Sequence, residues 1–258
     1  MHRPILLLAT ALLAACVADV PHRSQPAHIA IAAKPSTPIA PDTAAPMLLG
    51  ALEAAAPQAN PQVLDLALKA RRCAINRGAA SLDSRLAVID YSRPSTERRL
   101  WVFDMQKASL LFDEYVAHGR GSGDNMAQHF SNVEGSLQSS LGLFTTAETY
   151  EGDNGYSLRM DGLEPGVNDH ARSRAIVIHG AWYVDPLLAL KQGRLGRSYG
   201  CPALRPQVAH AVIDSLKQGQ LLFAYYPDRG WLSKSRFLDC GQSQFAAERV
   251  PALHATSR

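Results

Sequence analysis

One cysteine and one histidine are placed where they could act together as a nucleophile and its base. Cys201 is presented by the glycine-punctuated turn Gly196–Pro202, and His179 ends the β-branched apolar run Ile176–His179. A thiol with a pKa of about 8.5 needs a neighbouring base or cation to become a thiolate at neutral pH. His179 can supply the base and later protonate a leaving amine. The pair therefore predicts thiol acyl-transfer chemistry.

Residues around the turn could complete such a site. Gly200 lets the backbone approach a substrate, so the amides of Gly200 and Cys201 could form an oxyanion hole. Arg197 and Arg205 flank Cys201 and could hold substrate carboxylates. The alternative is that both arginines are solvated surface charges. His118 and Tyr183 are further candidates for lining the cleft.

The four cysteines, Cys16, Cys73, Cys201 and Cys240, allow an argument from their number. If Cys16 is lipidated, three thiols remain in an oxidising compartment, and an odd number leaves one free. Cys201 is the natural free thiol, because its Ser-Tyr-Gly-Cys-Pro surroundings argue against burial as a small apolar side chain. Cys73 and Cys240 are then free to pair, a disulfide that we treat as a hypothesis.

Other chemistries fit the sequence less well. Adding His210 to Cys201 and His179 does not make a zinc site, since no Cys-x-x-Cys or His-x-x-His pair is present. The glycine-rich segment His118–Gly123 lacks the Gly-Lys-Ser/Thr of a nucleotide loop. A net charge of +3 is too small to indicate nucleic-acid binding. We therefore predict no metal, no cofactor and no nucleic-acid partner.

The N-terminus predicts export. Ile5–Leu13 is too short to span a bilayer as a helix and fits the apolar region of a signal peptide. Leu13-Ala14-Ala15-Cys16 resembles a bacterial lipobox, which implies a signal peptide over residues 1–15, cleavage before Cys16 and a lipid anchor on its thiol. An ordinary signal peptide cut after Ala18 is the alternative. Both place the protein in the periplasm, and Val17, which is not aspartate, favours the outer membrane for an anchored form.

The rest of the chain divides into three parts. Residues 16–46, rich in Ala and Pro, read as a disordered tether or an N-terminal tail. Residues 47–240 form the predicted catalytic domain, and residues 241–258 a loose tail. Helical spacing and terminal signals predict helices over 61–78 and 206–219. Apolar runs predict strands at 86–89, 99–105, 110–116, 139–146, 175–179 and 221–226, and the polar stretch 150–166 is expected to form surface loops.

His179-Gly180 followed by Ser198-Tyr199-Gly200-Cys201 resembles the signature of the L,D-transpeptidase (YkuD-type) family. The wider context is similar to murein L,D-transpeptidase catalytic domains. It includes Asp90–Ser92, Arg99–Val102, Val116–Gly119, Ser139–Gly142 and Gly196–Ser198.

The resemblance implies a mostly β, sandwich-like fold with flanking helices and an enzyme acting on peptidoglycan stem peptides. Cys201 would attack a diaminopimelate carbonyl, release D-Ala and pass the acyl group to a second stem. The motif adds Ser198 to the catalytic set, and Gly180 and Tyr199 to the residues expected to contact substrate. Carbapenems are expected to acylate the cysteine.

Three departures and two alternatives accompany this interpretation. Tyr199 stands where the family pattern has a second histidine, Pro202 follows the nucleophile, and the spacing from His179 to Cys201 is a few residues longer than is usual in the family. If water replaces the acceptor amine, the protein is an L,D-carboxypeptidase or endopeptidase on the same stems. A peptidoglycan-binding lipoprotein without catalysis is the alternative from another class.

Overall fold

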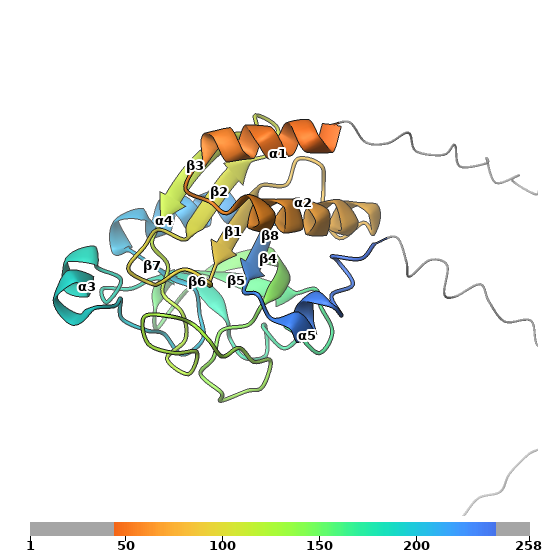
Figure 1. Cartoon of the computed structure of the whole chain (residues 1–258). Helices are drawn as coiled ribbons and strands as arrows, with labels where there is room; N and C mark the ends of the chain where they lie inside the picture. Colours follow the sequence, from red (N-terminus) through yellow and green to blue (C-terminus); the bar gives the residue numbers. More distant parts are fainter. Residues whose placement is uncertain (1–43, 241–258) are drawn as a thin grey trace, which may run out of the picture. The chain divides into compact units, whose positions relative to one another are not determined.

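An eight-stranded sheet runs through the computed structural model of the chain, which describes residues 44–240 (Figure 1). The strand order is β3-β2-β1-β8-β4-β5-β6-β7. The strands are β1 (Leu86–Asp90), β2 (Leu100–Asp104), β3 (Ser109–Glu114), β4 (Gly142–Gly152), β5 (Gly155–Gly162), β6 (Val177–Gly180), β7 (Ala203–Leu204) and β8 (Leu221–Tyr225). The pairs β1–β8 and β6–β7 are parallel, and the other neighbours are antiparallel.

The two outer ends of the sheet meet. Just after β3, the amide of Ala117 donates to the carbonyl of Ala203 in β7 at 2.9 Å. Gly119 forms a second bridge to Ser198, in the turn that precedes β7. The sheet thus curls until its first and last strands are joined, which brings the glycine-rich loop against the cysteine turn.

Five helices flank the sheet in the described residues: α1 (Ala44–Ala55), α2 (Pro61–Asn76), α3 (Pro186–Gln192), α4 (Pro206–Leu216) and α5 (Arg229–Leu232). Helix α2 begins as its sequence predicts, because the Asn60 side chain accepts the Gln62 amide at 2.9 Å and Pro61 fills the first position. Helices α1 and α2 pack together over β1, β3 and β8, and α4 packs on β5 and β6 (Figure 1). The predicted mostly β fold with flanking helices is confirmed.

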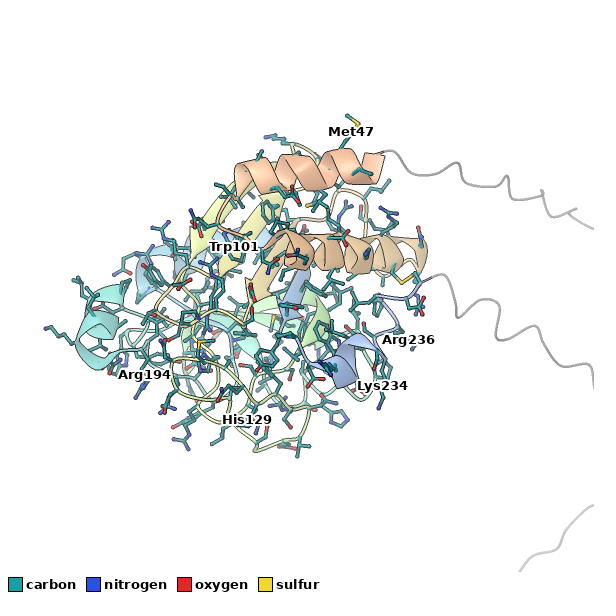
Figure 2. All side chains as sticks on the ribbon, viewed as in Figure 1. Met47, Trp101, His129, Arg194, Lys234 and Arg236 are labelled. Carbon is teal, nitrogen blue, oxygen red and sulfur yellow. A yellow bond between two sulfur atoms is a disulfide. The ribbon has the colours of Figure 1, made fainter. Side chains whose placement is uncertain are left out.

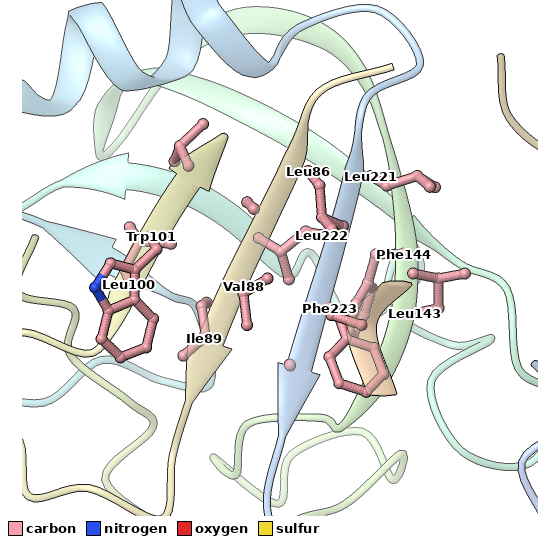
Figure 3. Packing of buried hydrophobic residues seen from close by; sticks show 14 of the residues in the cluster. Leu86, Val88, Ile89, Leu100, Trp101, Leu143, Phe144, Leu221, Leu222 and Phe223 are labelled. Atoms are coloured by element: carbon pink, nitrogen blue, oxygen red, sulfur yellow. The ribbon is translucent and has the colours of Figure 1, made fainter. Parts of the chain in front are cut away.

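The core lies where the central strands are covered on both faces. Every residue of β1 is buried, and β8 is buried through Ala224. Figure 3 shows Val88, Trp101 and Phe223 from neighbouring strands packed in this cluster. Burial on both faces explains why these strands have continuous apolar sequences instead of alternating ones. At one side of the core a disulfide joins Cys73 of α2 to Cys240, with the Cα atoms 5.6 Å apart.

The expectation that residues 150–166 form surface loops is wrong for most of that stretch. Strands β4 and β5 form a long hairpin in which Gly152 pairs with Gly155 across the turn Asp153-Asn154. The Asn154-Gly155 dipeptide suits such a turn, because Gly155 adopts a φ of +70°. The hairpin matters for the site because Ser157 of β5 pairs with His179 of β6.

Several N- and C-terminal expectations fall outside residues 44–240. These are the signal peptide over 1–15, the anchor at Cys16, most of the tether over 16–46 and the tail over 241–258. Helix α1 begins at Ala44, just before the predicted domain start at Met47. Within the described range, no helix combines the length and apolar character needed to cross a bilayer.

Candidate active site

Cys201 lies against the strand that carries His179. In the parallel β6–β7 pair, Ala203 is opposite His179, so Cys201 lies alongside Val177. The Val177 amide donates to Cys201 Sγ at 3.4 Å, and the thiol lies 3.6 Å from the Ala175 carbonyl oxygen. Val177 and His179 point to the same face of β6, with Cα atoms about 7 Å apart at the usual strand rise. The structure thus places the predicted nucleophile beside Val177, two residues before the predicted base on the same strand.

The hydrogen bond of His179 fixes which ring nitrogen can act as a base. Nδ1 lies 3.0 Å from the carbonyl oxygen of Gly180, which can only accept, so Nδ1 carries the hydrogen. Nε2 then keeps its lone pair in the neutral ring, and it makes no hydrogen bond within residues 44–240. Gly180, expected to contact substrate, therefore orients the imidazole through its carbonyl.

Burial leaves both groups neutral at rest. It lowers the pKa of His179 below its ordinary value of 6.5. It also raises the pKa of Cys201, an effect opposed by the Val177 amide and by the charge of Arg174. Cys201 is the free thiol of the described residues, but the expectation that its turn keeps it from burial is wrong, because its side chain packs against β6 and is only 8% exposed. At neutral pH the two groups are therefore a thiol and a neutral imidazole.

Hydrogen bonds within the turn correct the roles expected for Ser198 and Gly200. Ser198 Oγ donates to the Cys201 carbonyl at 2.6 Å and accepts the Gly200 amide at 3.1 Å. The Gly200 amide is therefore not available as an oxyanion donor, and Ser198 shapes the turn instead of reacting. Gly200 is required by its φ of +129° and because a Cβ there would lie 2.8 Å from Ile176 Cδ1.

His118 does not line a cleft, contrary to the sequence-based expectation. It has no exposed surface, and its Nδ1 lies 2.8 Å from the Arg99 guanidinium. Because arginine can only donate, Nε2 carries the hydrogen and faces the Gly123 carbonyl at 3.4 Å. Burial, followed by the Arg99 charge, lowers the pKa of His118 to about 3. This histidine is a neutral structural residue beneath the glycine-rich loop.

The two arginines that flank Cys201 already have carboxylate partners. Arg205 forms a two-bond ion pair with the buried Glu114, at 3.0 and 2.6 Å. Arg197 donates to Asp124 at 2.8 Å and to the Gly123 carbonyl at 2.9 Å. Both side chains are partly exposed and already ion-paired, so neither is a fully solvated charge nor an unpaired one waiting for a substrate carboxylate. They fix the ends of the turn and of β3.

Two tyrosines of the expected contact set keep part of their side chains exposed. Burial, with smaller effects from the charges of Cys201 and Tyr199, raises the pKa of Tyr183 to about 12. Tyr199 is 69% exposed, and its ring lies beneath the Arg120 guanidinium, 4.6 Å from centroid to carbon. Of the expected contact residues, Tyr183 and Tyr199 are the two whose side chains stay available.

Arg174 is a component that sequence reasoning missed. Its guanidinium donates to four neutral oxygens, those of the Ser131 and Gln138 carbonyls and the Ser136 and Ser140 hydroxyls, at 2.5 to 3.2 Å. It has no hydrogen-bonded carboxylate within the described range, and it lies beside Gly200. A positive charge with no hydrogen-bonded carboxylate, but within the field of Glu134, is thus held near the nucleophile. The only sequence signal is its position shortly before the β6 run.

Comparison with known families agrees with this geometry. The sequence model of the L,D-transpeptidase catalytic domain matches residues 55–225, which is more than half of the chain. The chain therefore belongs to the L,D-transpeptidase catalytic domain family. Comparison with curated proteins gives no match.

Solved structures with similarity to the chain are also L,D-transpeptidases. One from Mycobacterium smegmatis is 15% identical, with a TM-score of 0.34, over 55% of this chain and 59% of that one. One from Stackebrandtia nassauensis is 14% identical, with a TM-score of 0.34, over 65% and 67% of the two chains. The alignment thus spans less than two thirds of the M. smegmatis protein.

Proposed function

We propose that the protein is a peptidoglycan L,D-transpeptidase that acts through a thioester on Cys201. The observation that carries this proposal is the contact of Cys201 Sγ with the β6 backbone, next to a His179 whose Nε2 is unprotonated, in a chain of this family. The substrates are stem tetrapeptides, in which diaminopimelate is followed by a terminal D-Ala.

In the first half-reaction, His179 Nε2 takes the proton of the Cys201 thiol as Sγ attacks the diaminopimelate carbonyl carbon. The tetrahedral intermediate collapses when the bond to the D-Ala nitrogen breaks. The imidazolium returns its proton to that nitrogen, so D-Ala leaves as a neutral amine. The acyl group remains on sulfur as a thioester, which is reactive toward amines.

In the second half-reaction, the side-chain amine of another stem attacks the thioester. His179 accepts the proton lost by the attacking amine, the carbon–sulfur bond breaks, and the proton returns to Cys201. The product is a cross-link between two stems. Water as the acceptor would instead give a free tripeptide, which is the carboxypeptidase outcome.

The N-terminal sequence supports a location for this reaction. We infer that the protein is exported to the periplasm and attached to a membrane by a lipid on Cys16. Incorporation of labelled palmitate that disappears in Cys16→Ser would support the anchor. A wild-type protein that takes up no label and begins after Ala18 would overturn it.

Incubation of purified wild type and Cys201→Ala with tetrapeptide muropeptides tests the activity. Cross-linked dimers and free D-Ala from wild type alone are expected. Tripeptides without dimers would mean that the protein hydrolyses the stems and does not cross-link them. Intact-mass analysis after carbapenem treatment gives a second readout, and an adduct that persists in Cys201→Ala would contradict the mechanism.

A further inference from the structure

Beside the cysteine turn lies an open cavity of about 470 Å³. Its lining includes Arg120, Gly121, Gly123, Asp124, His129 and Arg197. Figure 2 shows His129 and Arg194 at the loop-rich end of the molecule, away from Met47 on α1. The glycine-rich segment His118–Gly123, which has no role in the proposed mechanism, contributes Arg120, Gly121 and Gly123 to the lining of this cavity.

The positive charges around this cavity are not equivalent. Arg197 hydrogen-bonds Asp124 at 2.8 Å, and Arg194 lies 3.7 Å from the same carboxylate. Arg120 has no carboxylate partner within residues 44–240, and its guanidinium instead lies over the Tyr199 ring. Arg120 is exposed, so its charge can pair with an anion that enters from solvent.

Arg120 is held at a fixed place relative to the thiol. Its backbone amide donates to the Ser198 carbonyl at 2.8 Å, and Ser198 Oγ in turn holds the Cys201 carbonyl at 2.6 Å. Its side chain rests on Tyr199, which lies two positions before the nucleophile. The backbone of the glycine-rich loop, which carries Arg120, is therefore hydrogen-bonded to the turn that carries Tyr199 and Cys201.

We propose that Arg120, supported by Tyr199, binds a free carboxylate of the donor stem and so positions the scissile bond at Cys201; this rests on the proposed function. A guanidinium stacked on a ring by one face keeps its N–H edge free for two parallel bonds to a carboxylate. Stacking also limits the rotamers of Arg120 before the substrate arrives. Tyr199, where the family pattern has a histidine, thereby acquires a role in substrate recognition.

A tetrapeptide stem offers two such groups, the side-chain carboxylate of diaminopimelate and the C-terminal carboxylate of D-Ala. Three donor stems distinguish them: the unmodified stem and the two stems in which one carboxylate is an amide. Each is assayed for D-Ala or D-alaninamide release with wild type, Arg120→Ala, Arg120→Lys and the control Arg98→Ala. Arg98 is a suitable control because it also stacks on a tyrosine, Tyr115, and lies outside the site.

For the unmodified stem, Arg120→Ala should raise KM about tenfold with little change in kcat, the loss expected for one charge-assisted contact. For one of the two amidated stems, the wild-type KM should rise by a similar factor. For the same stem, the KM of Arg120→Ala should be no higher than it is for the unmodified stem. Arg120→Lys should recover part of the affinity, and Arg98→Ala should behave as wild type.

An unchanged KM in Arg120→Ala would overturn the proposal. So would an increase in KM that is the same for both amidated stems and the same in wild type as in Arg120→Ala. Failure of the proposed function has a different signature, because wild type would then release no D-Ala from any of the three stems.

Discussion

His118 and His179 are both buried, but their Nδ1 atoms have hydrogen-bond partners of opposite kinds. At His118 that partner is a donor, the Arg99 guanidinium, and the other nitrogen faces the Gly123 carbonyl. At His179 it is an acceptor, the Gly180 carbonyl, and Nε2 makes no hydrogen bond in the described part of the chain. The same side chain is therefore a structural link in one place and a candidate base in the other.

The comparison shows that burial alone does not mark a catalytic histidine. Burial lowers the pKa of both rings, so both are neutral at pH 7. What distinguishes them is a nitrogen lone pair left available beside a thiol. Substitutions at the two positions should therefore differ most in their effect on the activity of the folded protein.

The largest expected effect is on catalysis at His179. His179→Ala removes the base, so kcat/KM for D-Ala release should fall by about 10²–10⁴-fold, the usual contribution of general acid–base catalysis. The melting temperature should also fall, because the ring is buried and its removal leaves a cavity, so activity is measured on the folded fraction. Kinetics and thermal unfolding measured on one preparation separate a loss of catalysis from a loss of stability. A variant retaining more than a tenth of wild-type activity would remove His179 from the mechanism.

The next effect is on stability at His118. His118→Ala leaves a buried Arg99 N–H without its acceptor and opens a cavity, which should cost roughly 2–4 kcal/mol of unfolding free energy. Urea unfolding at pH 7 measures the loss. Activity of the folded fraction should stay within a factor of about three, because His118 does not face the substrate. A stable but inactive variant would reverse the assignment.

The contrast between the two histidines also shows where the sequence is informative. Local signals were sufficient for α2, whose cap Asn60 and Pro61 are adjacent in sequence, and for the apolar strands β1 and β8. The turn carrying Cys201 was visible through its glycines. The sequence predicts loops where the β4–β5 hairpin lies, because the residues at the exposed end of the hairpin are polar, although Asn154-Gly155 marks its turn.

Partners distant in sequence could not be predicted. Glu114, which holds Arg205, is separated from it by 91 positions, and Arg99 meets His118 across two strands. Arg174 depends on oxygens of residues 131–140, whose location follows only from the folded loop. Composition gives the charge of each side chain, but the fold decides which charges are already paired.

The third prediction concerns the pH dependence of stability. The folded-state pKa of His118 is lowered to about 3, whereas an unfolded histidine titrates near 6.5. Between these values the unfolded chain binds the extra proton, so stability falls as pH falls, with a limiting slope of about 1.4 kcal/mol per pH unit. His118→Gln can accept from Arg99 and donate to Gly123 without titrating. Urea unfolding at pH 7 and pH 5 should therefore show a smaller loss in this variant than in wild type. Equal losses would mean that His118 is protonated in the folded protein.

The smallest effect tests the arginine beside the thiol. Arg174 lowers the pKa of Cys201, so Arg174→Gln should shift the pH dependence of Cys201 alkylation by iodoacetamide to higher pH. Arg174→Lys keeps the charge and should shift it less, although it cannot reproduce all four hydrogen bonds. Arg159→Gln is the control and should leave the profile unchanged, because Arg159 is a half-buried arginine on β5 that pairs with Glu148. If Arg174→Gln and Arg174→Lys shift the profile equally, the guanidinium acts by holding the loop, and its charge has no part in activating the thiol.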